Sequence, residues 1–508
     1  MTKLSPPFLI IGDSGQREIL AAATTVDPSQ NLAVFIVGGF IRDSLLGRPV
    51  HDLDLAVEGN TAVFAEALAE KLDAPLFALH LEAGMYRLIL QGQAFDQIDV
   101  SATAGTLIED LSRRDFTVDA MAVPLDSIGM PGDRLAIIDP AGGLGDLENK
   151  ILRAVAPDVF QKDPARLLRG VRLAAELGFA IEPGTERLMI ENAQLAASVA
   201  GERTREELLR LLSLPSAGAT VESLDRLGLL THIFPELEPS RGVDQPIEHT
   251  WDVLGHQLKT VSSFDWVLRR GDWSHAMAEA QRIIPWDKAA EAYFASPVNG
   301  GASRLALARL AALIHDIAKP ETKTLAPNGR VRFYGHPSRG AEVAAEMLKR
   351  LRFSQKEIKF VAAMVEAHMR PNQMGPEAMP PTPKAAYRYL RDTGDAAVAT
   401  LYLSLADHLA ARGPTLVLDN FREHVKIVGY ILAERGRQAE KAPKRLIDGH
   451  ELESCFGVKP GPEMGKILEA IDEAQATGEI ATKEEAFELA GDLIEDEAGR
   501  GDKQANRG

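Results

Sequence analysis

The sequence is poor in cysteine, with Cys455 the single one among 508 residues. One cysteine cannot form an internal disulfide, and no cysteine cluster is available to hold zinc, which excludes a disulfide-stabilised secreted scaffold. Long hydrophobic runs are also absent, because stretches such as 33–37 fall far short of the roughly 18 residues that a membrane span needs. Residues 1–10 lack the apolar core of a signal peptide, so we expect a cytoplasmic protein without membrane contact.

An excess of positive charge is missing too. Lys and Arg number 56 against 73 Asp and Glu, which gives a net charge of −17. Because proteins that bind nucleic acid non-specifically tend to be basic, any RNA site here must be a local basic patch. The 45% hydrophobic and 25% charged residues exclude collagen-like, coiled-coil and disordered chains, and the length suggests about three domains.

The first 150 residues alternate between short strand and helix patterns. Strands are expected at 33–37, 53–57, 75–79, 85–90 and 95–100, and helices at 40–46 and 61–72. Strands spaced this closely favour a mixed or antiparallel sheet with few helices. The rest of the chain shows helical periodicity, with examples at 163–177, 202–212 and 221–230. The predicted fold class is therefore α+β, with a sheet domain followed by a mostly helical body.

Two aspartates, Asp52 and Asp54, stand two residues apart in a predicted strand. Alternate residues of a strand point to the same face, so both carboxylates converge while Leu53 and Leu55 face the core. Such a pair can hold divalent cations that activate an attacking hydroxyl and neutralise a leaving pyrophosphate, as in nucleotidyl transfer. In isolation, the same pair also fits a solvated strand edge.

A glycine pair, Gly38 and Gly39, lies upstream at a predicted strand-to-helix turn and is followed by Arg42. Glycines there let backbone N–H groups approach triphosphate oxygens, the helix N-terminus favours negative charge, and Arg42 can pair with a phosphate. The alternative is an ordinary glycine turn. The segment is not a Walker loop, because no Gly-Lys-Ser/Thr follows.

Several motifs occur in one order along the chain. They are VGGFIRD at 37–43, LGR at 46–48, DLDLAV at 52–57, DLSRRDFTVDAMA at 110–122, DP at 139–140, GGLGDL at 142–147, DPARLLRGVR at 163–172, LIDG at 446–449 and PGPEMG at 460–465. Together they resemble the class II tRNA nucleotidyltransferase and bacterial poly(A) polymerase family of the polymerase beta superfamily. Asp119 stands where the family usually has Asn, and Lys162 where it commonly has Glu.

The resemblance implies a domain order. A polymerase-beta-like, mixed-sheet nucleotidyltransferase head would span 1–148, a helical neck and RNA-binding body 149–240, and a helical RNA-facing arm 431–492. Residues 241–430 would form a further helical domain. Residues 493–508 are small, polar and charged, which predicts a disordered tail.

The resemblance also implies residue roles. Asp52 and Asp54 would be catalytic and bind Mg²⁺, and Asp99 could supply a third carboxylate. The residues implied to contact the nucleotide are Gly38, Gly39, Arg42, Arg114, Asp115, Asp163, Arg166, Arg169 and Arg172. Asp163 and Arg166 would read the Watson–Crick edge, because Asp accepts from the exocyclic amine that CTP and ATP carry and UTP and GTP lack.

The activity implied is Mg-dependent addition of C and A to tRNA 3′ ends from CTP and ATP, with no obligatory protein partner. Addition of CC only, of A only, or of a poly(A) tail stays open. These activities share the head motifs, and Lys162 leaves the base selectivity unresolved.

A second candidate site is centred on His315 and Asp316 in the apolar segment 310–318. Buried polar groups need partners, and metal ligation is one solution. The surrounding candidates are His249, His336, His368 and Asp407. Each histidine alone would more often be a satisfied core or surface residue.

The order His, His-Asp, His, His, Asp resembles the HD phosphohydrolase superfamily, which implies that residues 241–430 form an HD metal-dependent phosphohydrolase-like domain. The resemblance implies one or two divalent ions (Mg, Mn, Ni, Co or Fe), with Asp316 bridging them and Lys319 meeting a phosphate oxygen. HD regions attached to nucleotidyltransferases include 2′,3′-cyclic phosphodiesterases, phosphatases and degenerate domains. A chain that is chiefly an HD phosphohydrolase, whose head only binds nucleotide, is the alternative from another class.

Overall fold

The computed structural model describes residues 8–9, 11, 13–26, 32–90, 92, 94–128, 134–374, 381–441 and 445–505. The chain divides into two compact units. The first comprises 1–211 and 223–233, and the second comprises 212–222 and 234–508. The predicted head therefore shares one unit with most of the predicted neck, and the predicted HD region shares the other with the arm.

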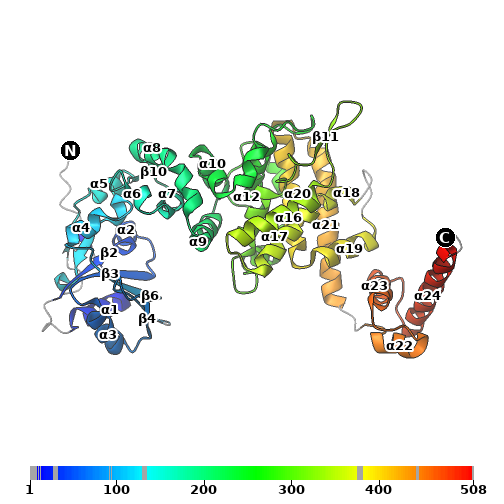
Figure 1. Ribbon diagram of the computed structural model, residues 1–508, viewed down its shortest axis with the longest axis horizontal. Coiled ribbons are helices and arrows are strands. Elements are labelled where there is room, and N and C mark those ends of the chain that lie inside the picture. Colours follow the sequence, from blue (N-terminus) through cyan, green and yellow to red (C-terminus); the bar gives the residue numbers. More distant parts are fainter. Residues whose placement is uncertain are drawn as a thin grey trace. The chain divides into compact units, whose positions relative to one another are not determined.

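A six-stranded mixed sheet forms the head, with the strand order β4-β5-β6-β3-β2-β7 (Figure 1). The strands are β2 (Ala33–Val37), β3 (Asp52–Glu58), β4 (Leu76–His80), β5 (Met85–Ile89), β6 (Gln97–Ala102) and β7 (Ala122–Pro124). β3 and β6 run parallel, and the other neighbouring pairs are antiparallel. The mixed sheet predicted from the strand spacing is confirmed.

Alternation along β3 separates the core from the site. Leu53 and Leu55 are fully buried in a cluster with residues of α1 (Ser14–Thr24) and α3 (Thr61–Leu72), which cover that face of the sheet. Asp52 and Asp54 therefore project from the opposite face, because successive side chains of a strand alternate. That second face also carries α4 (Leu107–Ser112), which packs on Val37 and Ala56.

The remaining elements up to residue 233 complete the head and form the neck. They are β1 (Phe8–Leu9), which pairs with β8 (Leu135–Ala136), then α2 (Gly39–Leu45), α5 (Gly143–Glu148), β9 (Ile151–Leu152), α6 (Val159–Lys162), α7 (Ala165–Leu177), β10 (Ala180–Ile181), α8 (Pro183–Glu191), α9 (Gly201–Leu212), α10 (Gly218–Arg226) and α11 (Leu230–Ile233). α7 buries Leu167, Leu168 and Val171 along one stripe, as its periodicity predicts. It ends at Gly178, whose φ of +68° suits a glycine cap.

The second unit contains a helical body. Its elements are α12 (Val253–Val267), α13 (Ala278–Ile283), α14 (Lys288–Ala295), α15 (Arg304–Ile314), the hairpin β11 (Lys323–Leu325) and β12 (Val331–Phe333), α16 (His336–Arg350), α17 (Gln355–Ala367), α18 (Arg370–Gln373), α19 (Pro383–Thr393), α20 (Ala397–Arg412) and α21 (Leu418–Lys441). α12 packs against α15 and α20, and α16 packs against α17. A buried ion pair joins α15 to α12, with Arg309 Nε 2.6 Å from Asp265 Oδ1.

The same ion pair also binds the backbone of residues 212–218, where the second unit begins. The Arg309 guanidinium donates to the carbonyl oxygens of Leu212, Leu214 and Pro215. Asp265 Oδ2 accepts from the backbone N–H groups of residues 217 and 218. A charged pair taken out of water is stabilised only when its remaining donors and acceptors are satisfied, and here the backbone of 212–218 satisfies them.

The arm follows with α22 (Gly449–Phe456), α23 (Pro462–Thr477) and α24 (Lys483–Ala505), drawn in orange and red in Figure 1. These helices bury a small core of their own, which includes Leu452, Ile467 and Ala486. α24 reaches Ala505, so the disordered tail predicted at 493–508 is wrong for 493–505, where a regular helix continues. Glu and Ala in this stretch are good helix formers, a preference that the charge-based prediction underweighted.

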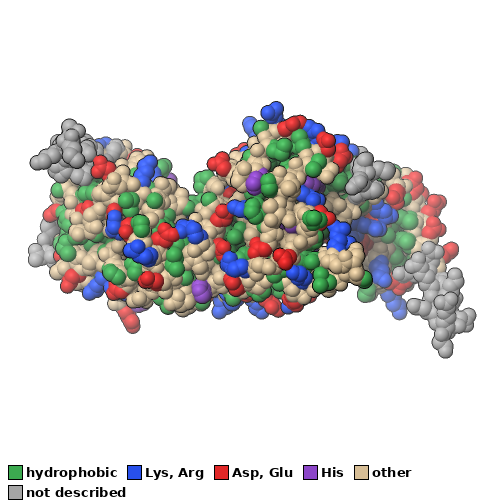
Figure 2. Space-filling view, turned by 90° about the horizontal axis from the view of Figure 1, so that it is seen from above, with side chains coloured by type: hydrophobic (Ala, Val, Ile, Leu, Met, Phe, Trp, Pro, Cys, Tyr) green, Lys and Arg blue, Asp and Glu red, His purple; other side chains and the backbone are tan. Residues whose placement is uncertain are grey.

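Surface charge is mixed on the face drawn in Figure 2, where basic and acidic side chains are interspersed over both units. No helix within the described ranges is long and apolar enough to cross a membrane.

Candidate functional site

Asp54 lies where β2 and β3 meet the turn into α2. Val37 pairs with Asp54 across the two strands, so Gly38 passes beside the Asp54 carboxylate. A Cβ placed on Gly38 would come within 2.9 Å of Asp54 Oδ2 and 3.3 Å of Arg114 Nη1. Gly38 has a φ of +74°, which glycine adopts at little cost. The structure thus brings Gly38, Asp54 and Arg114 together.

The paired carboxylates are costly to ionise. Burial raises the pKa of Asp54 to about 6, with the Arg114 charge opposing the shift and the Asp99 charge adding to it. Partial burial and the charges of Asp99 and Asp96 also raise the pKa of Asp52. A divalent cation would relieve this repulsion, so the donor set and its electrostatics fit a metal held by Asp52 and Asp54.

Arg42 is buried on α2 and is already engaged by carboxylates. It donates through Nη1 to Asp119 Oδ1 at 2.6 Å, and through Nε and Nη2 to Asp43 at 3.1 and 2.7 Å. Burial lowers the pKa of Arg42, but the charges of Asp119 and Asp43 outweigh it and raise the pKa, so the guanidinium stays charged. Asp119 thus fixes the position of the Arg42 guanidinium. Direct contact of Arg42 with a phosphate stays a prediction.

Other predicted nucleotide residues form ion pairs around this turn. Arg114 contacts Asp110 at 3.2 Å, and Arg169 Nε lies 2.7 Å from Asp115 Oδ2. Both arginines are partly exposed, which leaves them accessible to a ligand. Arg172 is different, because it is buried on α7 between Glu176 and Glu207 at 2.5 and 2.6 Å. Arg172 therefore forms ion pairs that join α7 to α9. No contact in the described structure supports its predicted role in nucleotide binding, which stays a prediction.

The predicted base-reading pair lies at the start of α7. Arg166 donates through Nη2 to the backbone carbonyl of Arg113 at 2.9 Å, which fixes the guanidinium beside the segment that carries Arg114. Asp163 accepts from Nη1 and Nη2 of Arg203 on α9, at 2.9 and 2.8 Å. Arg166 Nε lies 3.8 Å from Asp163 Oδ2. Both side chains are thus oriented by neighbours in the same unit.

A second cluster lies inside the helical body, at the ends of three helices. His315 follows α15, His368 follows α17, and His336 begins α16. The Nδ1 atoms of all three lie 2.6–2.9 Å from a backbone carbonyl oxygen three residues earlier in the chain. Each ring therefore donates Nδ1–H to that carbonyl and turns Nε2 toward the others, which is how proteins orient imidazole ligands of a metal.

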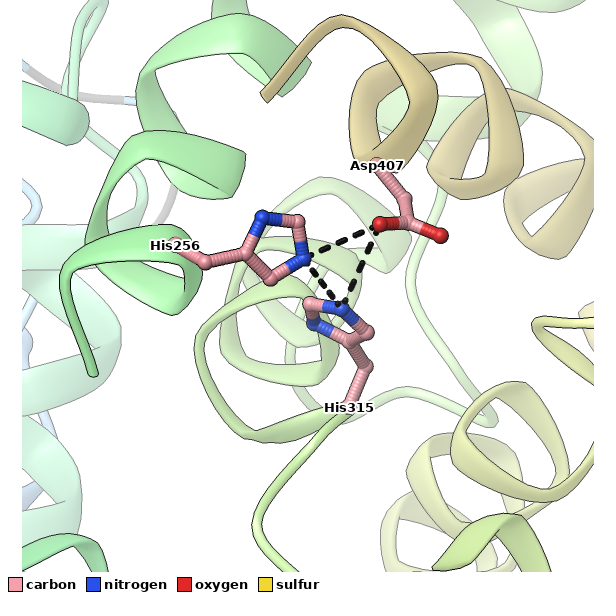
Figure 3. A group of neighbouring side chains, drawn as sticks. All are labelled: His256, His315 and Asp407. Carbon is pink, nitrogen blue, oxygen red and sulfur yellow. Dashed lines mark hydrogen bonds and ion pairs between the residues drawn. The ribbon is translucent and has the colours of Figure 1, made fainter. Parts of the chain in front are cut away.

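The Nε2 atoms converge on two carboxylates. Figure 3 shows His256 and His315 facing Asp407, with His256 Nε2 3.0 Å from Asp407 Oδ1 and 3.2 Å from His315 Nε2. On the other side, His336 Nε2 and His368 Nε2 lie 3.3 and 3.6 Å from Asp316 Oδ1. Two unprotonated nitrogens this close repel unless a proton or cation lies between them. The set therefore fits divalent metal, with Asp316 between the two groups.

The histidines of the cluster differ in pKa. Burial and the neighbouring His315 charge lower the pKa of His368 to about 3, which keeps it neutral as a ligand must be. Burial opposes protonation of His315 as well, but the charges of Asp316 and Asp407 prevail and raise its pKa to about 10. His315 is thus the proton carrier of the cluster, and a metal ion would take the place of that proton.

His256 takes the place that the sequence assigned to His249. His256 lies on α12 with its ring 5.2 Å from that of His315, whereas His249 precedes the helix and stacks edge-on against His256 at 5.4 Å. The potential metal groups among the described residues contain His256 and not His249. His249 instead lines a cavity of about 540 Å³ above the cluster. That cavity is also lined by Asp316, Lys319, Arg332, Asp407 and Arg412.

Comparisons with known proteins show similarity along most of the chain. Residues 34–153 match the family model "Poly A polymerase head domain", and two further models, named for an RNA-binding site of polymerase A and for tRNA nucleotidyltransferase domain 2, match 178–240 and 338–490. An A-adding tRNA nucleotidyltransferase of Deinococcus radiodurans is 33% identical over 89% of this chain and 93% of its own length. A CC-adding tRNA nucleotidyltransferase of Thermus thermophilus is 34% identical over 89% and 92%.

The chain belongs to the tRNA nucleotidyltransferase family. It is accordingly an RNA nucleotidyltransferase by enzyme class. The fold agrees, because a Thermotoga maritima CCA-adding enzyme complexed with tRNA aligns with a TM-score of 0.60 over 95% of this chain and 96% of that one, at 22% identity.

Two residues of this nucleotidyltransferase were missed from sequence. Arg203 carries no signal that points to Asp163, because the two are 40 positions apart and meet through the packing of α9 on α7. His256 could have been found, because Val253, Leu254 and His256 share the buried side of one helix while His249 lies outside its periodic pattern.

Proposed function

We propose that this nucleotidyltransferase adds CMP and AMP from CTP and ATP to the 3′ ends of tRNA. The observation that carries the proposal is the joint placement of Asp54, Gly38 and Arg114 beside Asp52. It is supported by the relatives, which are named as A-adding and CC-adding tRNA nucleotidyltransferases.

The mechanism follows from the charges and the space around β3. Asp52 and Asp54 would hold Mg²⁺, which when bound activates the RNA 3′-hydroxyl and neutralises the leaving pyrophosphate. The tight turn at Gly38 keeps side-chain bulk away from Asp54, so that the triphosphate can approach the backbone N–H groups of the turn. Arg114 and Arg169 supply partly exposed positive charge beside the acids for the phosphates.

Base choice would be made by Asp163 and Arg166. A carboxylate accepts from the exocyclic amine of cytosine or adenine, and a guanidinium donates to the adjacent ring acceptor. Arg203 and the backbone carbonyl of Arg113 hold the two side chains in fixed directions. Fixed donors and acceptors reject a base with the opposite pattern, because the mismatched polar groups stay unpaired.

Primer extension separates the possible products. Purified protein with Mg²⁺ is given tRNA transcripts that end before CCA or after CC, or a generic oligonucleotide, with CTP and ATP separately and together. Completion of CCA followed by a stop is the expected result. Addition of C only or A only would assign the chain to the type of one of its two relatives, an unending A tail would indicate poly(A) polymerase, and no incorporation would refute the proposal.

The helical cluster supports a second activity, a metal-dependent phosphohydrolase. The specific observation is the convergence of the histidine Nε2 atoms on Asp316 and Asp407, next to a cavity lined by Lys319, Arg332 and Arg412. Divalent metal would be held by the cluster and would supply a hydroxide nucleophile when bound. The basic residues of the cavity would hold the phosphate, as the HD resemblance implies for Lys319.

Hydrolysis of 2′,3′-cyclic nucleotides and of phosphate monoesters tests this activity, with Mg²⁺, Mn²⁺, Ni²⁺ and Co²⁺ compared. His315→Ala with Asp316→Ala is expected to remove hydrolysis and spare nucleotide addition, and Asp52→Ala with Asp54→Ala to do the reverse. Loss of both activities in either double variant, with the fold intact, would contradict two independent sites.

A further inference from the structure

A third carboxylate lies next to the pair on β3. Asp99 on β6 stands opposite Asp54 in the parallel register of the two strands. Residues opposite each other on neighbouring strands project from the same face and lie about 5 Å apart. Asp99 is therefore within reach of any ion that Asp52 and Asp54 hold.

Arg87 already pairs with Asp99. It stands opposite Asp99 on the other side, in the antiparallel register of β5 and β6. Its Nε and Nη2 donate to the two oxygens of Asp99, each at 2.7 Å. Such a bidentate pair is the strongest geometry for arginine and carboxylate, and it occupies a lone pair on each oxygen, so a metal ion would have to compete with the arginine for Asp99.

We propose that Arg87 is a positioning residue that withholds Asp99 from the metal site, so that Asp52 and Asp54 alone serve as protein ligands. The inference rests on the proposed nucleotidyltransferase function of the same site.

The chemistry of the reaction explains the arrangement. Mg²⁺ has about six ligand positions with strict geometry, and substrate phosphates and the attacking hydroxyl need several of them. A third protein carboxylate would occupy one more position and would add negative charge against the incoming triphosphate. Arg87 neutralises that charge while leaving Asp99 in place on the strand.

Metal binding by the full chain tests the inference, with Mn²⁺ as the probe and free Mn²⁺ measured by EPR. Arg87→Met frees Asp99, and we expect about tenfold tighter Mn²⁺ binding, because affinity for hard cations rises with the number of charged ligands. Arg87→Met combined with Asp99→Asn should return to the wild-type affinity, and Arg87→Lys, which keeps the charge, should stay near it. The helical cluster is common to all these proteins, so differences among them report on the head.

Equal Mn²⁺ affinity in Arg87→Met and in the double variant would overturn the inference, because Arg87 would then only support the fold. A second readout is the Mg²⁺ concentration for half-maximal nucleotide addition, which should fall in Arg87→Met and recover in the double variant. Failure of the proposed function looks different: wild-type Mn²⁺ binding would then be unchanged by Asp52→Asn with Asp54→Asn.

Discussion

Arg203 donates from its two terminal nitrogens to the two oxygens of Asp163, at 2.9 and 2.8 Å. The pair joins the start of α9 to the start of α7 and sets the direction of a carboxylate that we propose to read the incoming base. The backbone N–H of Ala165 also donates to Asp163, so the carboxylate is held in place from both α7 and α9. Base selectivity would then depend on a contact far from the chemical step.

Asp163→Ala should blur base choice more than it harms metal binding. Loss of one recognition contact costs about 1–3 kcal/mol, so discrimination of CTP and ATP against UTP and GTP should fall by about 10- to 100-fold. Single-nucleotide incorporation measures it. Arg210→Ala is the matched control, because Arg210 forms an exposed ion pair with Glu206 within α9. Unchanged selectivity in Asp163→Ala would refute the assignment.

Gly38→Ala should inactivate nucleotide addition, because its Cβ would lie 2.9 Å from Asp54 Oδ2. Displacing a catalytic group by this little can lower the rate by about 100-fold. Gly47→Ala is the control for the backbone cost alone, because Gly47 has a similar φ of +67° with no atom within 4 Å of the added Cβ. Similar rates for the two variants would contradict a role for the space beside Asp54.

Asp54→Asn should stabilise the metal-free head at neutral pH. The folded pKa of Asp54 is about 6, above its usual 3.8, so the folded state loses stability as pH rises through this window. The gain at pH 7 should be about 3 kcal/mol, from about two pH units at about 1.4 kcal/mol each, and should vanish near pH 4.

Amide hydrogen exchange of 52–58 in EDTA measures this effect, because the four tryptophans all lie outside the head. Asp52→Asn is the comparison: Asp52 is more exposed than Asp54 and its pKa is also raised, so this variant should slow exchange less than Asp54→Asn does. Faster exchange in Asp54→Asn at pH 7 would show that burial is not costly for this carboxylate.

His256→Ala should lower the metal content of the helical body, whereas His249→Ala should leave it unchanged. The reason is that His256 Nε2 lies 3.0 Å from Asp407 Oδ1, while His249 is absent from the potential metal groups of the described chain. Elemental analysis after dialysis against Mn²⁺ or Ni²⁺ gives the ratio of metal to protein. The opposite pattern would restore His249 as the ligand.

Arg309→Met should destabilise the helical body by about 3–5 kcal/mol, because it leaves Asp265 charged and buried. Denaturant unfolding followed by tryptophan fluorescence reports on this body. Arg339→Met, which removes exposed ion pairs with Glu321 and Glu342, should cost far less, because water screens exposed charges. Equal losses in the two variants would contradict a special role for the buried pair.

Local patterns explain which parts were predictable. β2 and α3 have the bounds that periodicity gave, because each buries its own alternating or amphipathic face. Asp52 and Asp54 were predictable for the same reason, since both lie on one strand. Partners that meet only through tertiary packing left no local signal, as with Arg203 and Asp163, or Arg87 and Asp99.

The choice between His249 and His256 also depends on tertiary packing. The resemblance fixed the order of ligands along the chain but not which histidine enters the cluster. That was decided by α12, whose buried side carries His256 into contact with α15 and α20. Lys162 remains the open position, because its side chain pairs with Asp158 and gives no sign of a role in base choice.

The pairing of Val37 with Asp54 ties catalysis to the folding of the head. A slip of one residue between β2 and β3 would turn Asp54 into the apolar core and move the glycine turn away from it. A head with such a slip could be compact and still have no activity. Specific activity after refolding would therefore measure the fraction of molecules in which β2 and β3 pair in the native register.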